Sequence, residues 1–173
     1  MSEHPHQKKH DRDKHEAHQR LVARLREQGV EIDRLTRELD NAALSTRTVP
    51  EKWSLKELVC HLWRVQRLFE GRIEAMLVKD DPVIVPYTPD GDTEFDLLVA
   101  HPAAETRTAF LADRESFAAR LDALSQAQWH RGGHHPEFAG FDVHFQVEYM
   151  THHEAHHTYQ LFVRRAALGK LAH

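Results

Sequence analysis

A long amphipathic stretch near the N-terminus is the feature that most constrains the fold. Core-type residues recur there at alternating steps of four and three, namely Leu21, Leu25, Gln28, Ile32, Leu35, Leu39 and Ala42. This spacing places one apolar stripe along a helix, as in helices that pack side by side in a bundle. We predict a helix over residues 15–44. Gly29 lies off the stripe, so it weakens this helix without ending it.

A second helix has a clear start. Pro50 closes the preceding connection, and Ser54 with Glu57 forms a capping box, in which each residue satisfies a free backbone N–H of the other. The helix that follows carries one apolar stripe, made of Leu55, Leu58, Leu62, Val65, Phe69, Ile73 and Met76. His61 borders this stripe, two turns into the helix.

Two more helices complete the predicted architecture, over residues 103–125 and 142–168. Residues 80–102 hold four prolines and form a long crossover with a short helix at 93–100, and residues 126–141 form a second loop. The predicted fold is all-α, a four-helix bundle with long crossover connections. The interior of such bundles is a common place for metal sites.

Composition narrows the class of protein. The chain has 173 residues, which suits one domain, and its seven Gly and seven Pro agree with a helical fold. A net charge of −4, with basic and acidic residues interleaved, gives no reason to expect a nucleic-acid partner. The lone Cys60 excludes an internal disulfide, and no run has the character of a signal peptide or a membrane span. We expect a cytoplasmic protein with no membrane partner.

The first residues differ from the rest of the chain. Residues 1–14 are polar and rich in histidine, so we predict a disordered tail there and a bundle domain over residues 15–170. The tail histidines, or the pair His152 and His156, leave room for a second, weaker metal site.

The fourth helix carries four histidines in six residues. At about 100° per residue, its apolar sector is centred between His153 and His157. His152 and His156 lie at the flank, and His144 lies opposite, in solvent. Two inward imidazoles four residues apart can ligate one ion, and neutral imidazole suits zinc, nickel and copper. Periodicity therefore selects His153 and His157.

A third ligand must come from another helix, because catalytic metal sites commonly use three protein ligands and keep one position open. His61 is the only histidine in the second or third predicted helix, and it borders a buried stripe. We predict a metal site formed by His61, His153 and His157.

The segment His153-Glu154-Ala155-His156-His157 also matches the H-E-x-x-H pattern of zinc proteases. Such enzymes need a further ligand downstream, and none of the sixteen residues after His157 is Asp or Glu. The extended pattern requires glycine and histidine where Gln160 and Val163 stand. We therefore reject the protease interpretation. Because Glu154 lies about 100° from His153, we expect it either to support the site without binding the metal or to make a helix contact.

Two blocks of the sequence resemble the DinB-like (DNA-damage-inducible) family of metal-binding four-helix bundles. They are Trp53-Ser54-Leu55-Lys56-Glu57-Leu58-Val59-Cys60-His61-Leu62 and His153-Glu154-Ala155-His156-His157-Thr158-Tyr159-Gln160. The resemblance implies a divalent metal, zinc or nickel, on His61, His153 and His157. It also implies relatives that are transferases or isomerases dependent on low-molecular-weight thiols.

The chemistry stays open at this stage. A divalent ion on three neutral imidazoles would lower the pKa of a bound water or thiol, so a hydrolase and a thiol S-transferase both fit. The alternative is a non-catalytic metal binder or stress-response bundle in which the ion is structural. Gln160 is either a partner of a ligand ring or an interhelical contact, and Trp63 and Trp129 are candidate pocket walls. Because Phe162 faces away from the site, we also predict a homodimer.

Overall fold

The computed structural model describes residues 5–171, with side chains from residue 13 onward. Its four long helices are α1 (Pro5–Thr36), α3 (Leu55–Val78), α5 (Ala103–Asp122) and α7 (Val143–Ala167). Three short helices lie between them, α2 (Asn41–Ser45), α4 (Thr93–Ala100) and α6 (Gln126–Trp129). Over this part of the chain, the predicted all-α four-helix bundle is confirmed, and no helix is long and apolar enough to cross a membrane.

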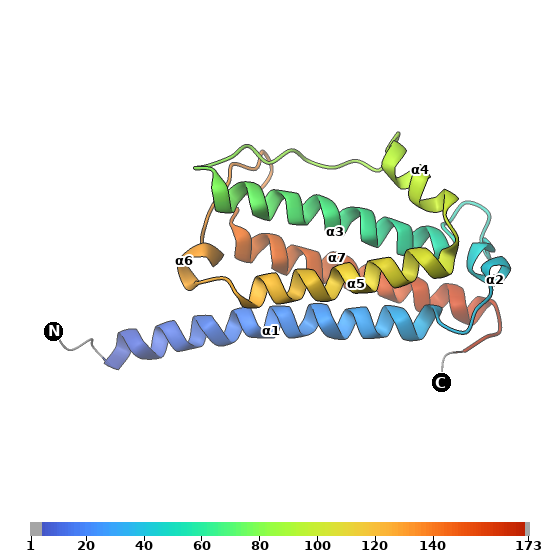
Figure 1. The fold of residues 1–173 in the computed structure, drawn as a ribbon, viewed down its shortest axis with the longest axis horizontal. Helices are drawn as coiled ribbons and strands as arrows, with labels where there is room; N and C mark the ends of the chain where they lie inside the picture. The colour runs from blue at the N-terminus through green and yellow to red at the C-terminus, as the bar shows by residue number, and fades with distance from the viewer. Residues whose placement is uncertain (1–4, 172–173) are drawn as a thin grey trace.

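The long helices do not simply alternate in direction. Helices α1 and α7 run one way, while α3 and α5 run the other (Figure 1). Each long helix contacts two others, in the pairs α1–α7, α3–α7, α1–α5 and α3–α5. Because α3 and α5 are parallel, the chain must return along the whole bundle between them. Residues 79–102 form this return, with α4 at its far end (Figure 1).

The predicted first helix is wrong at both ends. The backbone is helical from Pro5, so the structure extends α1 into the segment predicted as a tail, and the helix ends at Thr36 instead of residue 44. The break follows from Glu38, whose φ of 63° is left-handed, and from Asp40, whose side chain accepts a hydrogen bond from the Ala43 backbone N–H and starts α2. Side chains of residues 1–12 lie outside the described residues, so a metal role for the tail histidines stays a prediction.

Other boundaries agree more closely with the sequence. The Ser54–Glu57 capping box is present in both directions, and α4 spans the predicted residues 93–100. The third helix ends at Asp122, three residues early, because a second capping box at Ser125 and Gln128 starts α6. Helix α6 falls in the segment predicted as a loop over residues 126–141.

The two long loops meet at one end of the bundle. Isolated β-bridges join Val83 to His134 and Gly132 to Asp142. Gly133 permits this approach, because a Cβ there would lie 3.0 Å from the carbonyl oxygen of Pro82. The loops are thereby fixed over one side of α3 and α7, where they cover a cavity.

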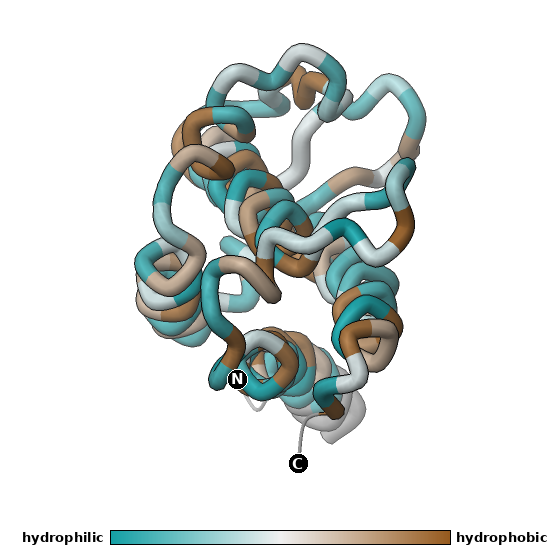
Figure 2. The backbone as a smooth tube through the Cα atoms, turned by 90° about the vertical axis from the view of Figure 1, so that its right-hand side faces the viewer, coloured by the Kyte–Doolittle hydropathy of each residue, from teal (hydrophilic) through white to brown (hydrophobic). Residues whose placement is uncertain are grey.

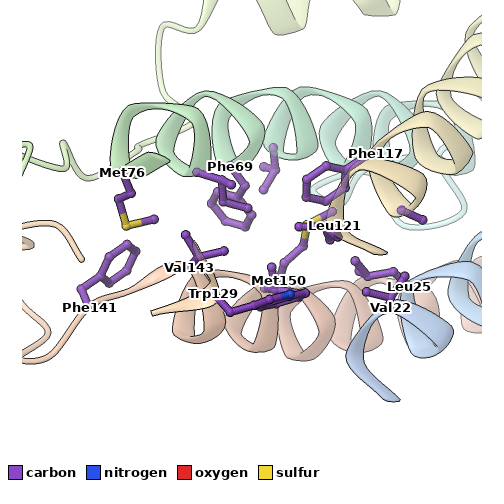
Figure 3. Packing of buried hydrophobic residues seen from close by; sticks show 14 of the residues in the cluster. Val22, Leu25, Phe69, Met76, Phe117, Leu121, Trp129, Phe141, Val143 and Met150 are labelled. Carbon is purple, nitrogen blue, oxygen red and sulfur yellow. The ribbon is translucent and has the colours of Figure 1, made fainter. Parts of the chain in front are cut away.

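The core fills the space between the helices (Figure 3). Phe69 and Met76 of α3 pack with Val143 and Met150 of α7 in one apolar cluster. An end-on view shows that hydrophobic stretches recur on each long helix (Figure 2). Gly29 lies inside α1 without breaking it, as predicted, and a Cβ there would come 3.3 Å from the Arg114 side chain. This close approach brings α1 against a buried arginine of α5.

Candidate metal centre

Three imidazoles meet at the α3–α7 interface. Nε2 of His153 lies 3.3 Å from Nε2 of His61 and 3.2 Å from Nε2 of His157. One ring nitrogen from each residue falls within 4.8 Å of the other two. The structure thus brings together the three histidines that were predicted from the sequence. His61 and His153 lie on different helices and are 92 residues apart in the chain.

These spacings suit ligands of a single ion. Two nitrogens bound to one zinc ion at 2.0–2.1 Å, in tetrahedral arrangement, lie about 3.3 Å apart. The two closest nitrogen pairs match this value. The cluster is consistent with a divalent metal, and its geometry leaves the choice of metal open.

Hydrogen bonds alone do not account for the nitrogen contacts. Nδ1 of His157 donates to Oε1 of Gln160 at 2.9 Å, so Nε2 of the neutral ring carries a lone pair. A proton on Nε2 of His153 can then serve only one of its two contacts. A cation would satisfy the facing lone pairs together.

All three rings are neutral at pH 7. Burial lowers the pKa of His61 to about 3 and that of His153 to about 4, and neighbouring rings act in the same direction. Burial also lowers the pKa of His157, against the opposing effect of its bond to Gln160. Neutral imidazole is the form that binds metal ions, so protons compete weakly here.

Gln160 contacts the ring of His157, which decides between the two roles left open by the sequence. Its oxygen orients His157, and its Nε2 lies 3.0 Å from Nε2 of His156. By contrast, Nδ1 of His61 is buried without a hydrogen-bond partner among the described residues. The ring of His157 is therefore oriented by a hydrogen bond to its Nδ1, and the ring of His61 is not.

Glu154 does not face the histidines. It is 1% exposed and accepts two hydrogen bonds from Arg114 of α5, one of 2.6 Å. Arg114 also donates to Oε1 of Gln66 and to the backbone oxygen of Leu25. This buried ion pair ties α7 to α5 and α1, which confirms the helix-contact role and leaves Glu154 unavailable as a base at the metal centre.

A cleft of about 430 Å³ opens beside the triad. Trp53 lines it, with its ring centroid 4.7 Å from that of His61. Trp63 and Trp129, the candidate walls, lie elsewhere: Trp63 donates to Asp113 and Trp129 stacks on His18. Trp53 stands before the N-cap Ser54, outside α3, so helical periodicity could not place it beside His61.

The remaining histidines of α7 lie away from the cleft. His152 and His156 are exposed, in line with their predicted flanking positions. The prediction that His144 lies in solvent is only partly right: its side chain is 31% exposed, but its ring packs 5.1 Å from that of His18 and its Nδ1 is buried. Helix α1 covers one side of this ring through His18. The periodicity of α7 alone cannot predict such a contact with another helix.

The comparisons with known proteins agree with this geometry. A family model described as the DinB superfamily matches residues 24–161. The chain belongs to the DinB superfamily. The resemblance drawn from the two sequence blocks is therefore confirmed.

A solved structure gives independent support for the fold. YfiT from Bacillus subtilis, described as a probable metal-dependent hydrolase with an unusual four-helix bundle topology, matches with a TM-score of 0.76. The two sequences are 18% identical, and the match covers 88% of each chain, so the likeness shows the fold alone. No curated protein matches this chain in sequence.

Proposed function

We propose that this DinB-superfamily protein is a metal-dependent enzyme, with His61, His153 and His157 as the protein ligands of one zinc or nickel ion. The observation that carries the proposal is the convergence of three neutral ring nitrogens at the edge of a 430 Å³ cleft. A structural zinc site is closed by a fourth protein ligand. The described residues offer only these three in the cluster, so an ion held by them would keep a position open to another ligand.

The reaction that the site supports best is thiol S-transfer to a small molecule. When bound, a divalent ion supplies a positive charge that lowers the pKa of a thiol or water at the open position. A thiol releases its proton more readily than water does, so it depends less on a general base. No carboxylate hydrogen-bonds to the triad among the described residues, and Glu154 is held by Arg114. A thiol nucleophile fits such a site better than water.

Side chains of the cleft would position the reactants. Trp53 and Phe69 place aromatic rings beside the triad, at 4.7 Å from His61 and 6.2 Å from His153 between ring centroids. These faces exclude water and suit an apolar portion of the substrate.

A metal-dependent hydrolase is the second candidate. Its support is the structural likeness to YfiT, which is described as a probable enzyme of that kind. The site would then activate water without a carboxylate hydrogen-bonded to the triad among the described residues.

The two reactions can be compared in one assay. The zinc- or nickel-loaded protein would be given monobromobimane with glutathione or cysteine and, in parallel, 4-nitrophenyl acetate without thiol. We expect thiol-dependent turnover that is lost in His61→Ala and retained in His144→Ala. Ester hydrolysis with the same mutant pattern, and no thiol turnover, would favour the hydrolase. Tight metal binding with neither activity would contradict the enzyme proposal and leave the structural metal.

We also propose that the protein forms a homodimer through the outer face of α7. Phe162 is 48% exposed and Tyr159 is 66% exposed on this helix. Sedimentation at micromolar concentration tests the proposal, and a monomer in both wild type and Phe162→Lys would overturn it.

A further inference from the structure

The cleft contains an arginine without a carboxylate partner. Arg72 of α3 lines the cleft, and its Nη2 donates to the backbone oxygen of Val85 at 2.6 Å. The neighbouring arginines of the same helix differ, because Arg64 pairs with Asp92 and Arg67 pairs with Asp113. Among the described residues, no Asp or Glu forms an ion pair with Arg72. Burial lowers the pKa of its guanidinium, which marks a charge taken partly out of water without compensation.

A second polar group beside Arg72 also lacks a partner. Gln146 of α7 lines the same cleft, is 0% exposed, and accepts a hydrogen bond from Nη1 of Arg72 at 3.4 Å. Because a guanidinium only donates, this contact assigns the amide oxygen to Arg72 and leaves the adjacent NH₂ group to find another acceptor. That buried Nε2 has no hydrogen-bond partner. An unpaired donor at such a position costs about 1–3 kcal/mol.

Other ionisable groups of the cleft do not neutralise Arg72. Glu137 is exposed, and its backbone N–H donates to Nδ1 of His135. Burial lowers the pKa of His135, and the nearby Arg72 acts in the same direction, so this ring is neutral at pH 7. Arg72 therefore supplies an uncompensated positive charge within the cleft.

Arg72 and the metal centre are close enough for one small molecule to reach both. Phe69 lies between them, with its ring centroid 5.2 Å from Cζ of Arg72 and 6.2 Å from the ring centroid of His153. His61 and Arg72 are eleven residues apart on α3, which is close to three full turns and places them on one face. A cleft of about 430 Å³ is in the size range of small-molecule sites.

We propose that Arg72 and Gln146 form a carboxylate-binding subsite, so that the substrate is a small organic acid whose opposite end reaches the histidine triad. The inference rests on the proposed function for the metal end only. One cation and one neutral amide donor match the single charge of a carboxylate. A phosphate monoester carries close to two charges at pH 7 and would leave one unpaired.

The test uses matched probes on the metal-free full-length protein, where a carboxylate has no metal to bind. Binding of phenylacetate, phenylacetamide and phenyl phosphate is measured by calorimetry or by NMR shifts. We expect phenylacetate to bind at least about tenfold more tightly than the amide. Arg72→Gln should remove this preference, and Arg67→Gln, which deletes a charge on the same helix outside the cleft, should keep it.

Two further variants test the subsite with smaller changes, in case Arg72→Gln does not fold. Arg72→Lys retains the charge but not the two-pronged donor, and Gln146→Leu removes the amide donor without changing charge. Both should weaken the carboxylate preference by a smaller factor than Arg72→Gln. Equal binding of phenylacetate and phenylacetamide, an unchanged preference in Arg72→Gln, or tighter binding of phenyl phosphate than of phenylacetate would overturn the subsite.

The same measurement on His61→Ala separates the two proposals. The carboxylate preference should persist in this variant, while metal binding and turnover are lost. Failure of the enzyme proposal would leave the carboxylate preference intact. Failure of the subsite would leave metal binding and turnover in place.

Discussion

The part of the chain that the structure describes contains two clusters of three histidines, and they differ in the surroundings of their ring nitrogens. In the metal centre the ring centroids of His153 and His157 lie 4.5 Å apart, and those of His61 and His153 lie 5.3 Å apart. In the second cluster, His18 lies 5.1 Å from His144 and 5.6 Å from His130. The rings are nearly as close in both. Only the first brings three ligand nitrogens within 4.8 Å of one another among the described residues.

The rings of the second cluster have different neighbours, and Nδ1 of His18 and Nδ1 of His144 are buried without a hydrogen-bond partner among the described residues. The ring of His18 stacks on Trp129, with centroids 4.3 Å apart and planes within 5°. Nδ1 of His130 lies 3.3 Å from Asp142, and Nε2 of His144 lies 3.7 Å from Glu148. Proximity of histidines therefore does not make a metal site. Convergence of three ring nitrogens distinguishes the first cluster among the described residues.

The largest expected effect is the loss of stability when the buried Glu154–Arg114 ion pair is broken. This pair fixes which face of α7 points into the bundle. Glu154→Gln leaves Arg114 buried without its counter-charge, so we expect the free energy of unfolding to fall by about 3–5 kcal/mol. Glu148→Gln, next to the second cluster on the exposed side of the same helix, should change it by less than about 0.5 kcal/mol. Urea unfolding of both variants measures the difference. Equal losses would show that Glu154 has no special structural role.

Metal ions should distinguish the clusters directly. Zinc at 100 times its dissociation constant should stabilise the folded protein by about 2.7 kcal/mol. For a protein of this size the melting temperature should rise by about 5–10 °C. His61→Ala should abolish the rise, and His144→Ala should keep it. If His144→Ala abolished the rise and His61→Ala did not, the assignment of the two clusters would be reversed.

The second cluster should be visible in the pH dependence of stability. Burial lowers the pKa of His18 to about 4, with His144, His130 and His15 adding to the effect and Asp142 opposing it. The unfolded chain binds this proton near pH 6.5 and the folded chain only near pH 4, so acid favours unfolding between these values. From pH 7 to pH 5 the cost is about 2 kcal/mol. His18→Gln should remove that part of the slope in metal-free protein, and an unchanged slope would contradict the burial of the neutral ring.

The smallest effect concerns the orientation of a ligand ring. Gln160→Leu removes the oxygen that accepts from Nδ1 of His157, so we expect metal affinity to fall about tenfold. Gln126→Leu, whose amide contacts His15 outside the metal centre, is the matched control. Competition with a coloured chelator measures both. No change in Gln160→Leu would mean that the hydrogen bond to Gln160 does not tune the ligand.

Helical periodicity predicted much of the fold and the triad, because both depend on which residues share a face. The Ser54 cap and the α4 span come from local signals of the same kind. The end of α1 at Thr36 was missed because Asp40 starts a competing helix. The cover over His144 and the place of Trp53 depend on contacts between distant segments, which one helix cannot reveal. The unpaired state of Arg72 likewise emerges only when every neighbouring acid is placed.

We propose above that His61, His153 and His157 bind one divalent ion with an open position. X-ray absorption on protein loaded with one equivalent of zinc tests it most directly. We predict three imidazole nitrogens at about 2.0–2.1 Å from the zinc ion and one oxygen ligand. An added thiol should replace this oxygen by sulfur. His61→Ala should lose one imidazole from this set. Wild-type coordination and affinity in His61→Ala, His153→Ala and His157→Ala alike would contradict the assignment of these three histidines as metal ligands.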